Sequence, residues 1–311
     1  MRIGLLLGGL QNAPALGALA AAVEQLGFDS LWAGDHVAFP APILDPLQLL
    51  ACSAAQTQRI QLGTCVYLLA LRHPTTVAKM VGTLDFISGG RLVFGVGVGG
   101  EFPREFQACS VPVRERGART NEAIVALRAL WRDAEVTHSG RFFQIGPVRL
   151  APPPAHAGGP PVWIGGRSDA ALRRSARLGD GYVGYLLTAD GFRERWDRIR
   201  ALAHEYGRDP RSLTGALMAF IVVGRDRETA VANAAAALGA MYRRPMESAA
   251  ARYAIAGTAA ECRAAIEAYA AAGVEHLVLT PFGHGDALLE QLHALADALD
   301  LRPRGATDSE G

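Results

Sequence analysis

The feature that most constrains this fold is a strand–helix–strand unit within residues 59–101. Residues 59–67 are rich in apolar and β-branched side chains, and residues 73–87 carry apolar side chains at helical spacing. The segment Ser88-Gly89-Gly90 ends that helix, and residues 92–96 are a continuous apolar run typical of a buried parallel strand. Two strands joined by a crossover helix predict an α/β fold with a parallel sheet.

The same alternation runs through the rest of the chain. Further strands are predicted at residues 2–7, 28–33, 161–164, 181–187, 213–223 and 274–280, and further helices at 14–26, 45–58, 114–131, 168–178, 191–206, 258–272 and 285–299. Residues 102–113 are predicted to form a loop. Eight strand–helix pairs in a chain of 311 residues predict one (β/α)8 TIM-barrel domain over residues 1–301.

Three segments depart from this alternation. Residues 135–155 contain short β-like pieces around Gly140 and Gly146 and predict an inserted hairpin. Residues 226–256 are helical but irregular, and such an insertion often shapes a substrate pocket or a subunit contact. Residues 302–311 are polar and are expected to form a flexible tail.

Composition narrows the classes of partner. A net charge of +1 without a basic stripe argues against nucleic-acid binding and favours small-molecule partners. The four cysteines are far apart, without the spacing of a metal site, and no signal segment precedes Ile3, so we expect a reduced, cytoplasmic protein that binds no metal. The Ala-rich stretch at 230–240 is too short for a membrane span, and no membrane association is expected.

Polar and glycine residues follow several predicted strands, whose carboxyl ends carry the sites of parallel α/β folds. Gly34-Asp35-His36 follows the second strand, and Gly97, Gly99 and Gly100 lead to Glu101 after the fourth. These glycines permit close approach of a ligand, or they only turn the chain. Gly165-Gly166-Arg167-Ser168 opens a helix, where a guanidinium and the helix N-terminus suit a phosphate; the alternative is an ordinary cap with a solvated arginine.

Together these segments resemble the bacterial luciferase-like superfamily of flavin and deazaflavin oxidoreductases. The resemblance covers nearly the whole chain and rests on residues 31–36, Arg72-His73-Pro74, 83–85, 88–91, 95–101 and 163–167. It implies a luciferase-like barrel with its cofactor at the carboxyl ends of the strands. Asp35-His36 resembles the branch that uses coenzyme F420, in which the acid helps to hold the cofactor and the histidine lies beside the reacting ring.

The resemblance also assigns roles to single residues. His36 is a suitable acid or base for the proton that accompanies hydride transfer, although it could instead be a capping or pocket-wall residue. Glu101 resembles an acid near the substrate, one residue further from the glycines than in the family pattern. Cys65-Val66 is the position of a non-prolyl cis peptide behind the cofactor, and Cys65 is interpreted as an inert buried thiol. His73, at a helix start, is interpreted as structural.

Three functions follow from these observations. The first is hydride transfer between F420 and a small organic substrate. The second is an FMN-dependent monooxygenase supplied with reduced flavin by a separate reductase, and the third is a barrel that binds a ligand without catalysis. A homodimer is also expected, with Leu47, Leu50 and Met80 among the candidate contact residues on the early helices.

Overall fold

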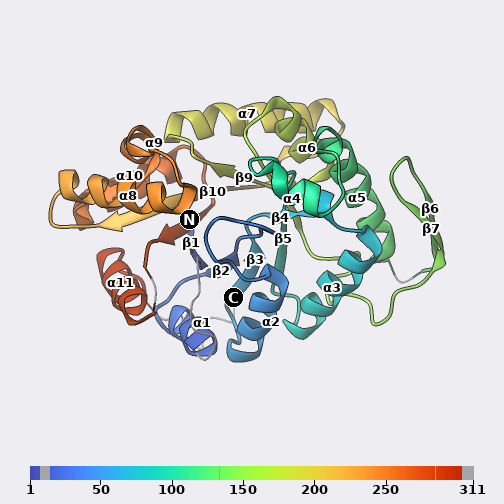
Figure 1. The fold of residues 1–311 in the computed structure, drawn as a ribbon, viewed down its shortest axis with the longest axis horizontal. Helices are drawn as coiled ribbons and strands as arrows, with labels where there is room; N and C mark the ends of the chain where they lie inside the picture. The colour runs from blue at the N-terminus through green and yellow to red at the C-terminus, as the bar shows by residue number, and fades with distance from the viewer. Residues whose placement is uncertain (8–14, 133, 284, 303–311) are drawn as a thin grey trace.

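A closed barrel of parallel strands forms the centre of the molecule and is surrounded by helices (Figure 1). The computed structural model describes residues 1–7, 15–132, 134–283 and 285–302. In that part of the chain the main sheet has ten strands, of which β4 and β11 are short additions, and the other eight close the barrel as β12 pairs with β1. In order, the barrel strands are β1 (Arg2–Leu7), β2 (Ser30–Ala33), β3 (Gln61–Thr64), β5 (Leu92–Gly97), β8 (Val162–Gly165), β9 (Gly181–Tyr185), β10 (Thr214–Val223) and β12 (His276–Pro281).

The helices pack around the outside of the barrel, as the alternation in the sequence predicts. They are α1 (Ala15–Gln25), α2 (Pro46–Gln56), α3 (Pro74–Ile87), α4 (Pro103–Ala108), α5 (Arg116–Leu130), α6 (Asp169–Leu178), α7 (Ala189–Glu205), α8 (Arg227–Tyr242), α9 (Glu247–Tyr253), α10 (Ala259–Ala271) and α11 (Gly285–Ala298). Both faces of the strands are therefore covered, which is why β5 and β8 are buried along their whole length. The predicted TIM-barrel fold is confirmed.

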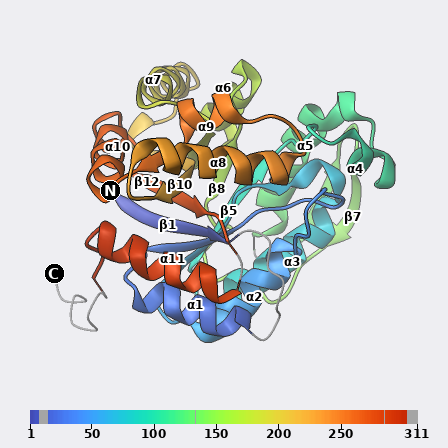
Figure 2. The ribbon, with the colours of Figure 1, turned by 60° about the vertical axis from the view of Figure 1, so that its left-hand side comes forward.

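Side chains inside the barrel fill its amino-terminal part and leave the other end free. Trp32 and Trp163 have ring centroids 5.3 Å apart and pack with Leu6, Val93 and Val278. A larger apolar core lies between the strands and the surrounding helices. In Figure 2 the strands run from the N-terminus at the left towards the right, where their carboxyl ends lie.

Polar caps fix the starts of several helices. Asp45 accepts a hydrogen bond from the amide of Leu47 at 3.0 Å and begins α2, and Thr258 forms a capping box with Glu261 at the start of α10. His73 accepts a hydrogen bond from the amide of Thr75 at 3.3 Å and begins α3. The structural interpretation of His73 is therefore confirmed.

Two insertions stand where the sequence departs from the alternation. The hairpin of β6 (Val136–Ser139) and β7 (Gln144–Val148) lies outside the barrel, at the right of Figure 1. Helices α8 and α9 form the second insertion and turn at Arg243, whose φ is 51°. Of the predicted tail, residues 303–311 lie outside the described part of the chain.

Three expectations were wrong, and one short strand was not foreseen. Residues 102–113 are not simply a loop, because they contain α4, whose first turn begins at Pro103. The predicted third strand is interrupted after β3 and resumes as β4 (Tyr67–Leu68). The strand β11 (Ile255–Gly257) was not predicted, because three residues are too few to show a strand periodicity. Leu47 and Leu50 are buried, since α2 turns them towards the core, whereas Met80 is 38% exposed.

Candidate functional site

A cavity of about 1130 Å³ lies at the carboxyl ends of the barrel strands. Its volume is slightly above the usual range of about 300–1,000 Å³ for small-molecule sites. All the site residues predicted from the sequence contribute to its wall: Asp35, His36, Cys65, Val66, Gly97, Gly99, Glu101, Gly165, Gly166, Arg167 and Ser168. The fold thus brings together the ends of four different strands, β2, β3, β5 and β8.

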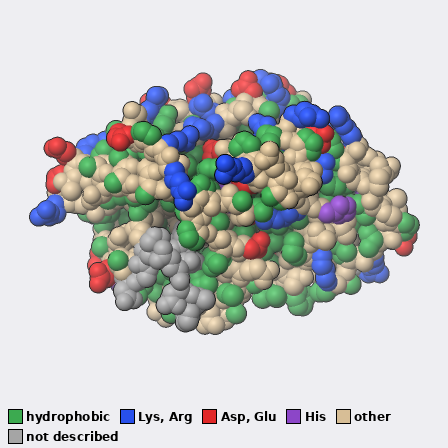
Figure 3. Space-filling model, viewed as in Figure 1, with side chains coloured by type: hydrophobic (Ala, Val, Ile, Leu, Met, Phe, Trp, Pro, Cys, Tyr) green, Lys and Arg blue, Asp and Glu red, His purple; other side chains and the backbone are tan. Residues whose placement is uncertain are grey.

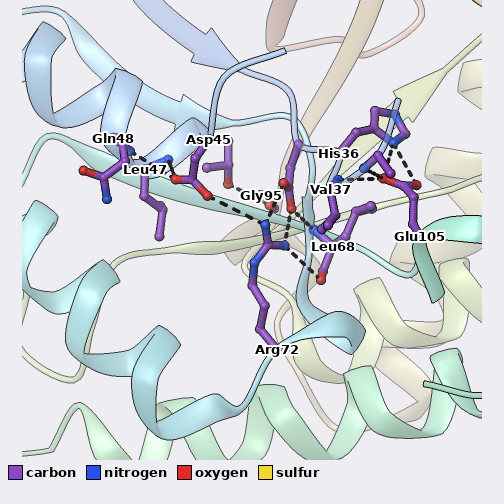
Figure 4. Close-up of polar contacts among 12 residues, drawn as sticks. His36, Val37, Asp45, Leu47, Gln48, Leu68, Arg72, Gly95 and Glu105 are labelled. Carbon is purple, nitrogen blue, oxygen red and sulfur yellow. Dashed lines mark hydrogen bonds and ion pairs between the residues drawn. The ribbon is translucent and has the colours of Figure 1, made fainter. Parts of the chain in front are cut away.

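His36 follows β2 and is held by a buried carboxylate. Its Nδ1 lies 3.0 Å from Oε2 and 3.2 Å from Oε1 of Glu105, on α4 (Figure 4). The Oε1 atom of Glu105 also accepts hydrogen bonds from the amides of Val37 at 2.6 Å and Ala38 at 3.1 Å. Glu105 is only 1% exposed, whereas the side chain of His36 is 23% exposed. The carboxylate therefore holds the imidazole at Nδ1 and leaves Nε2 as the atom that can act on a ligand.

Glu105 is a site residue that the sequence analysis missed. The signal was a proline followed by a glutamate two residues later, a pattern typical of a first helical turn. With residues 102–113 interpreted as a loop, no regular element was expected to carry Glu105 towards the second strand.

Asp35 is fully engaged with protein groups. Its Oδ1 accepts a hydrogen bond from Arg72 at 2.9 Å, and its Oδ2 accepts from Arg72 and from the amide of Leu68 at 2.8 Å. Burial opposes the charge of Arg72, but the hydrogen bond and the charge of Asp35 outweigh it, so the pKa of Arg72 is raised. Asp35 thus joins the segment that carries His36 to the end of the interrupted third strand.

The Cys65–Val66 peptide bond is cis, as the resemblance implied. Val66 points towards the neighbouring glycines, because a Cβ atom at Gly97 would lie 2.3 Å from Val66 Cγ2 and one at Gly165 would lie 2.8 Å from Val66 Cγ1. Val66 therefore fills the space that a side chain at either glycine would take, while both glycines still line the cavity. Burial raises the pKa of the Cys65 thiol to about 12, so Cys65 is a neutral wall residue.

A positively charged wall lies at the start of α6. Ser168 caps this helix by accepting a hydrogen bond from the amide of Ala171 at 3.3 Å, and Arg167 precedes it. Arg195, which the sequence analysis did not single out, also borders the cavity, and within the described residues its buried Nε has no hydrogen-bond partner. Figure 3 shows the face onto which the strand ends point, with Lys and Arg side chains frequent over its upper part, where Figure 1 places α6 and α7. An anionic group suits this wall.

Aromatic side chains form another part of the wall. The ring of His36 stacks on Phe39 at 4.3 Å and meets the edge of Phe102 at 5.4 Å. Glu101 also borders the cavity, close enough to Tyr185 and Tyr242 that its charge contributes to raising the pKa of both phenols, after the larger effect of burial. The predicted acid and base thus reach the same cavity from different strands.

The described part of the chain offers no cluster of metal ligands and no membrane-spanning helix. No group of three or more His, Cys, Asp or Glu side chains there could hold a metal ion. None of its helices combines the length and the apolar character needed to cross a membrane.

Comparisons with known proteins show the family and the fold. A family model described as luciferase-like monooxygenase matches residues 2–299. The monooxygenase RslO1 of Streptomyces bottropensis superposes with a TM-score of 0.82 at 25% identity, covering 96% of this chain and 98% of that one. An F420-dependent secondary alcohol dehydrogenase has a TM-score of 0.83 at 22% identity, with the same coverage, and this likeness shows the fold alone. A phthiodiolone/phenolphthiodiolone dimycocerosates ketoreductase of Mycobacterium tuberculosis is 28% identical over 240 residues, which are 69% of this chain and 62% of the ketoreductase.

Proposed function

Since the chain belongs to the luciferase-like monooxygenase family, a family of oxidoreductases, we propose that it transfers a hydride between coenzyme F420 and a small organic substrate. The observation that carries this proposal is that His36 lines the cavity while its Nδ1 is held by the buried carboxylate of Glu105. A hydride transfer to or from a carbon–oxygen group also moves a proton, and a positioned imidazole is well suited to carry it.

Hydride transfer and proton transfer can be assigned to different groups in the cavity. When bound, F420 supplies a ring carbon that accepts or gives the hydride. If an alcohol is oxidised, the hydride leaves its carbon and its hydroxyl proton passes to Nε2 of His36, whose Nδ1 is held by Glu105. In the reverse direction, His36 returns that proton to the oxygen of the ketone. Glu105 stabilises the imidazolium that forms on the way.

The cavity has features that would hold such a cofactor. The anionic side chain would lie against Arg167, Ser168 and the N-terminus of α6, and the unpartnered Nε of Arg195 supplies a further donor. The planar ring would lie against the wall that Cys65 and Val66 form. The volume of about 1130 Å³ leaves room for a substrate beside the ring.

The second candidate is an FMN-dependent monooxygenase. The family description and the similarity to RslO1 favour it, and FMN offers the same combination of a planar ring and a phosphate. It would require reduced flavin from a partner reductase, and oxygen would be consumed.

Cofactor binding separates the two candidates. The affinities of the protein for F420 and FMN, each oxidised and reduced, are measured by fluorescence titration, together with oxygen uptake. We expect F420 to bind at least tenfold more tightly and oxygen uptake to stay at the level of a protein-free control. Tighter binding of reduced FMN with oxygen uptake above the control would favour the monooxygenase instead.

The role of His36 is tested by His36→Asn, which keeps a polar side chain but removes the group that exchanges the proton. We expect kcat to fall roughly 10²- to 10⁴-fold with little change in cofactor affinity. His73→Asn is the matched control, because His73 caps α3 outside the cavity wall and asparagine is also a good cap. A wild-type kcat in His36→Asn would show that His36 lines the cavity but does not transfer the proton.

A further inference from the structure

Two tyrosines meet in the cavity wall through their hydroxyl groups. Tyr185 stands at the end of β9 and Tyr242 at the end of α8, and their Oη atoms are 2.6 Å apart. Both residues line the cavity. Tyr242 comes from the irregular helical insertion, so this contact joins the insertion to the barrel.

Apolar rings surround the pair, and one guanidinium group lies over each tyrosine ring, Arg167 at 5.9 Å from Tyr185 and Arg244 at 5.6 Å from Tyr242. The ring of Phe220 lies 6.2 Å from Tyr185 and stacks on Phe282 at 5.3 Å, and Phe39 lies 6.1 Å from Tyr242. Burial raises the pKa of both phenols, and the charge of Glu101 adds to the effect. Both hydroxyls therefore stay protonated at physiological pH and act as neutral donors.

The pair has one more donor than the protein uses. Two phenols carry two hydroxyl protons, and the bond between them uses one, whichever tyrosine donates. Among the described residues, the only hydrogen bond made by either hydroxyl is the bond to the other. One O–H group thus remains available in an apolar part of the cavity, where an unmade hydrogen bond is costly.

Resting on the proposed function and extending it to the substrate, we propose that the Tyr185–Tyr242 pair binds a neutral oxygen, a carbonyl or a hydroxyl, of an otherwise apolar substrate. The pair lies at the same end of the cavity as the proposed base, because Phe39 contacts both His36 and Tyr242. The charge of Glu101 acts on both phenols more strongly than the opposing charge of the nearby arginine, Arg167 at Tyr185 and Arg244 at Tyr242, so a carboxylate is disfavoured there.

Ligand binding tests this inference without requiring turnover. The probes are cyclohexanone, its apolar isostere methylenecyclohexane, and the anion cyclohexanecarboxylate, each titrated by NMR against the full chain with and without F420. We expect cyclohexanone to bind most tightly. The double variant Tyr185→Phe/Tyr242→Phe should lose roughly 3- to 30-fold in cyclohexanone affinity and none for methylenecyclohexane.

The matched control is Tyr182→Phe, a buried tyrosine of the same strand that is not part of the cavity wall. It should bind all three probes as the wild type does. Each single Tyr→Phe variant should show an intermediate loss, which preserves the test if the double variant does not fold. Three outcomes would overturn the inference. The wild type could show no preference for the ketone, the tyrosine variants could keep the full preference, or the carboxylate could bind as tightly as the ketone. Failure of F420 to bind, with the probe results intact, would count against the proposed cofactor alone.

Discussion

The imidazole of His36 is oriented by Glu105, which is itself held by two backbone amides. In Glu105→Gln, the oxygen of the new amide can still accept from Val37, but its NH2 group then faces Nδ1 of His36. Nδ1 must become an acceptor, so the neutral ring is expected to carry its proton on Nε2, where a base needs a lone pair.

We therefore expect Glu105→Gln to lower kcat roughly 10²- to 10⁴-fold and to shift the ring ¹⁵N resonances of His36 towards the other tautomer. Glu115→Gln is the control, because Glu115 pairs with Arg119 outside the cavity wall. An unchanged tautomer together with an unchanged rate would mean that Glu105 does not position His36.

A second histidine makes stability depend on pH. His276 is buried in the barrel, with Nε2 2.6 Å from Ser30 Oγ, and burial lowers its pKa from 6.5 to about 3. Below pH 6.5 the unfolded chain takes up a proton at this position that the folded chain does not. The stabilisation is complete above pH 6.5, and it is lost as the pH falls from 6.5 towards 3.

Over this window, His276 should contribute a slope of about 1.4 kcal/mol per pH unit to the free energy of unfolding. His276→Gln cannot titrate, so its slope should be smaller by that amount even if the variant is less stable at every pH. Urea unfolding between pH 4.5 and 7.5 measures both slopes, and equal slopes would contradict the assignment.

Among the elements, helix α6 is the one expected to hold the anionic part of a cofactor. Gly166, before this helix, has a φ of 132°, and a Cβ there would lie 2.8 Å from Ala171 Cβ, so a substitution at Gly166 would strain the backbone as well as the site. Arg167→Gln is the cleaner change, and it should weaken F420 binding roughly 10- to 100-fold. Arg173→Gln, an exposed change on the same helix, should leave binding as it is. Equal affinities of the two variants would exclude Arg167 from the site.

The packing of β5 against the interrupted third strand depends on Val66. Gly97→Ala would place a methyl group 2.3 Å from Val66 Cγ2, which should destabilise the protein by about 1–3 kcal/mol. Val66→Ala in the same chain removes the obstructing methyl groups and should recover part of the loss. A double-mutant cycle from denaturant unfolding measures this coupling, and strictly additive effects would show that Gly97 is not required by Val66.

At the scale of the whole molecule, the homodimer stays a prediction, but the surface expected to form its interface is now α3 alone. Leu47 and Leu50 are core residues, whereas Met80, Phe86 and Ile87 are exposed on α3. Sedimentation velocity at micromolar concentration should give a dimer, and Phe86→Glu should weaken it tenfold or more, since a buried aromatic side chain contributes about 1.5–3 kcal/mol. Tyr206→Glu is the control, because Tyr206 is an exposed aromatic residue at the C-terminal end of α7 and not on α3. A monomeric wild-type protein would refute the prediction.

The sequence by itself determined the barrel and the positions that surround its cavity. Continuous apolar strands, caps such as Asp45 and Ser168, and glycines at strand ends are local patterns, and the topology of a parallel barrel places every strand end at one edge. His36 and Arg167 could therefore be assigned to one site before any contact was known.

Only the tertiary structure decided which side chains meet within that site. Glu105 reaches His36 across 69 residues of sequence, and Tyr185 meets Tyr242 across 57, so no local pattern could pair them. Val66 fills the space that Gly97 leaves because the two strands pack in one register, which also depends on distant segments. Periodicity specifies the face that a residue occupies, whereas a hydrogen bond or a steric fit depends on angstrom-scale placement that only the packed barrel supplies.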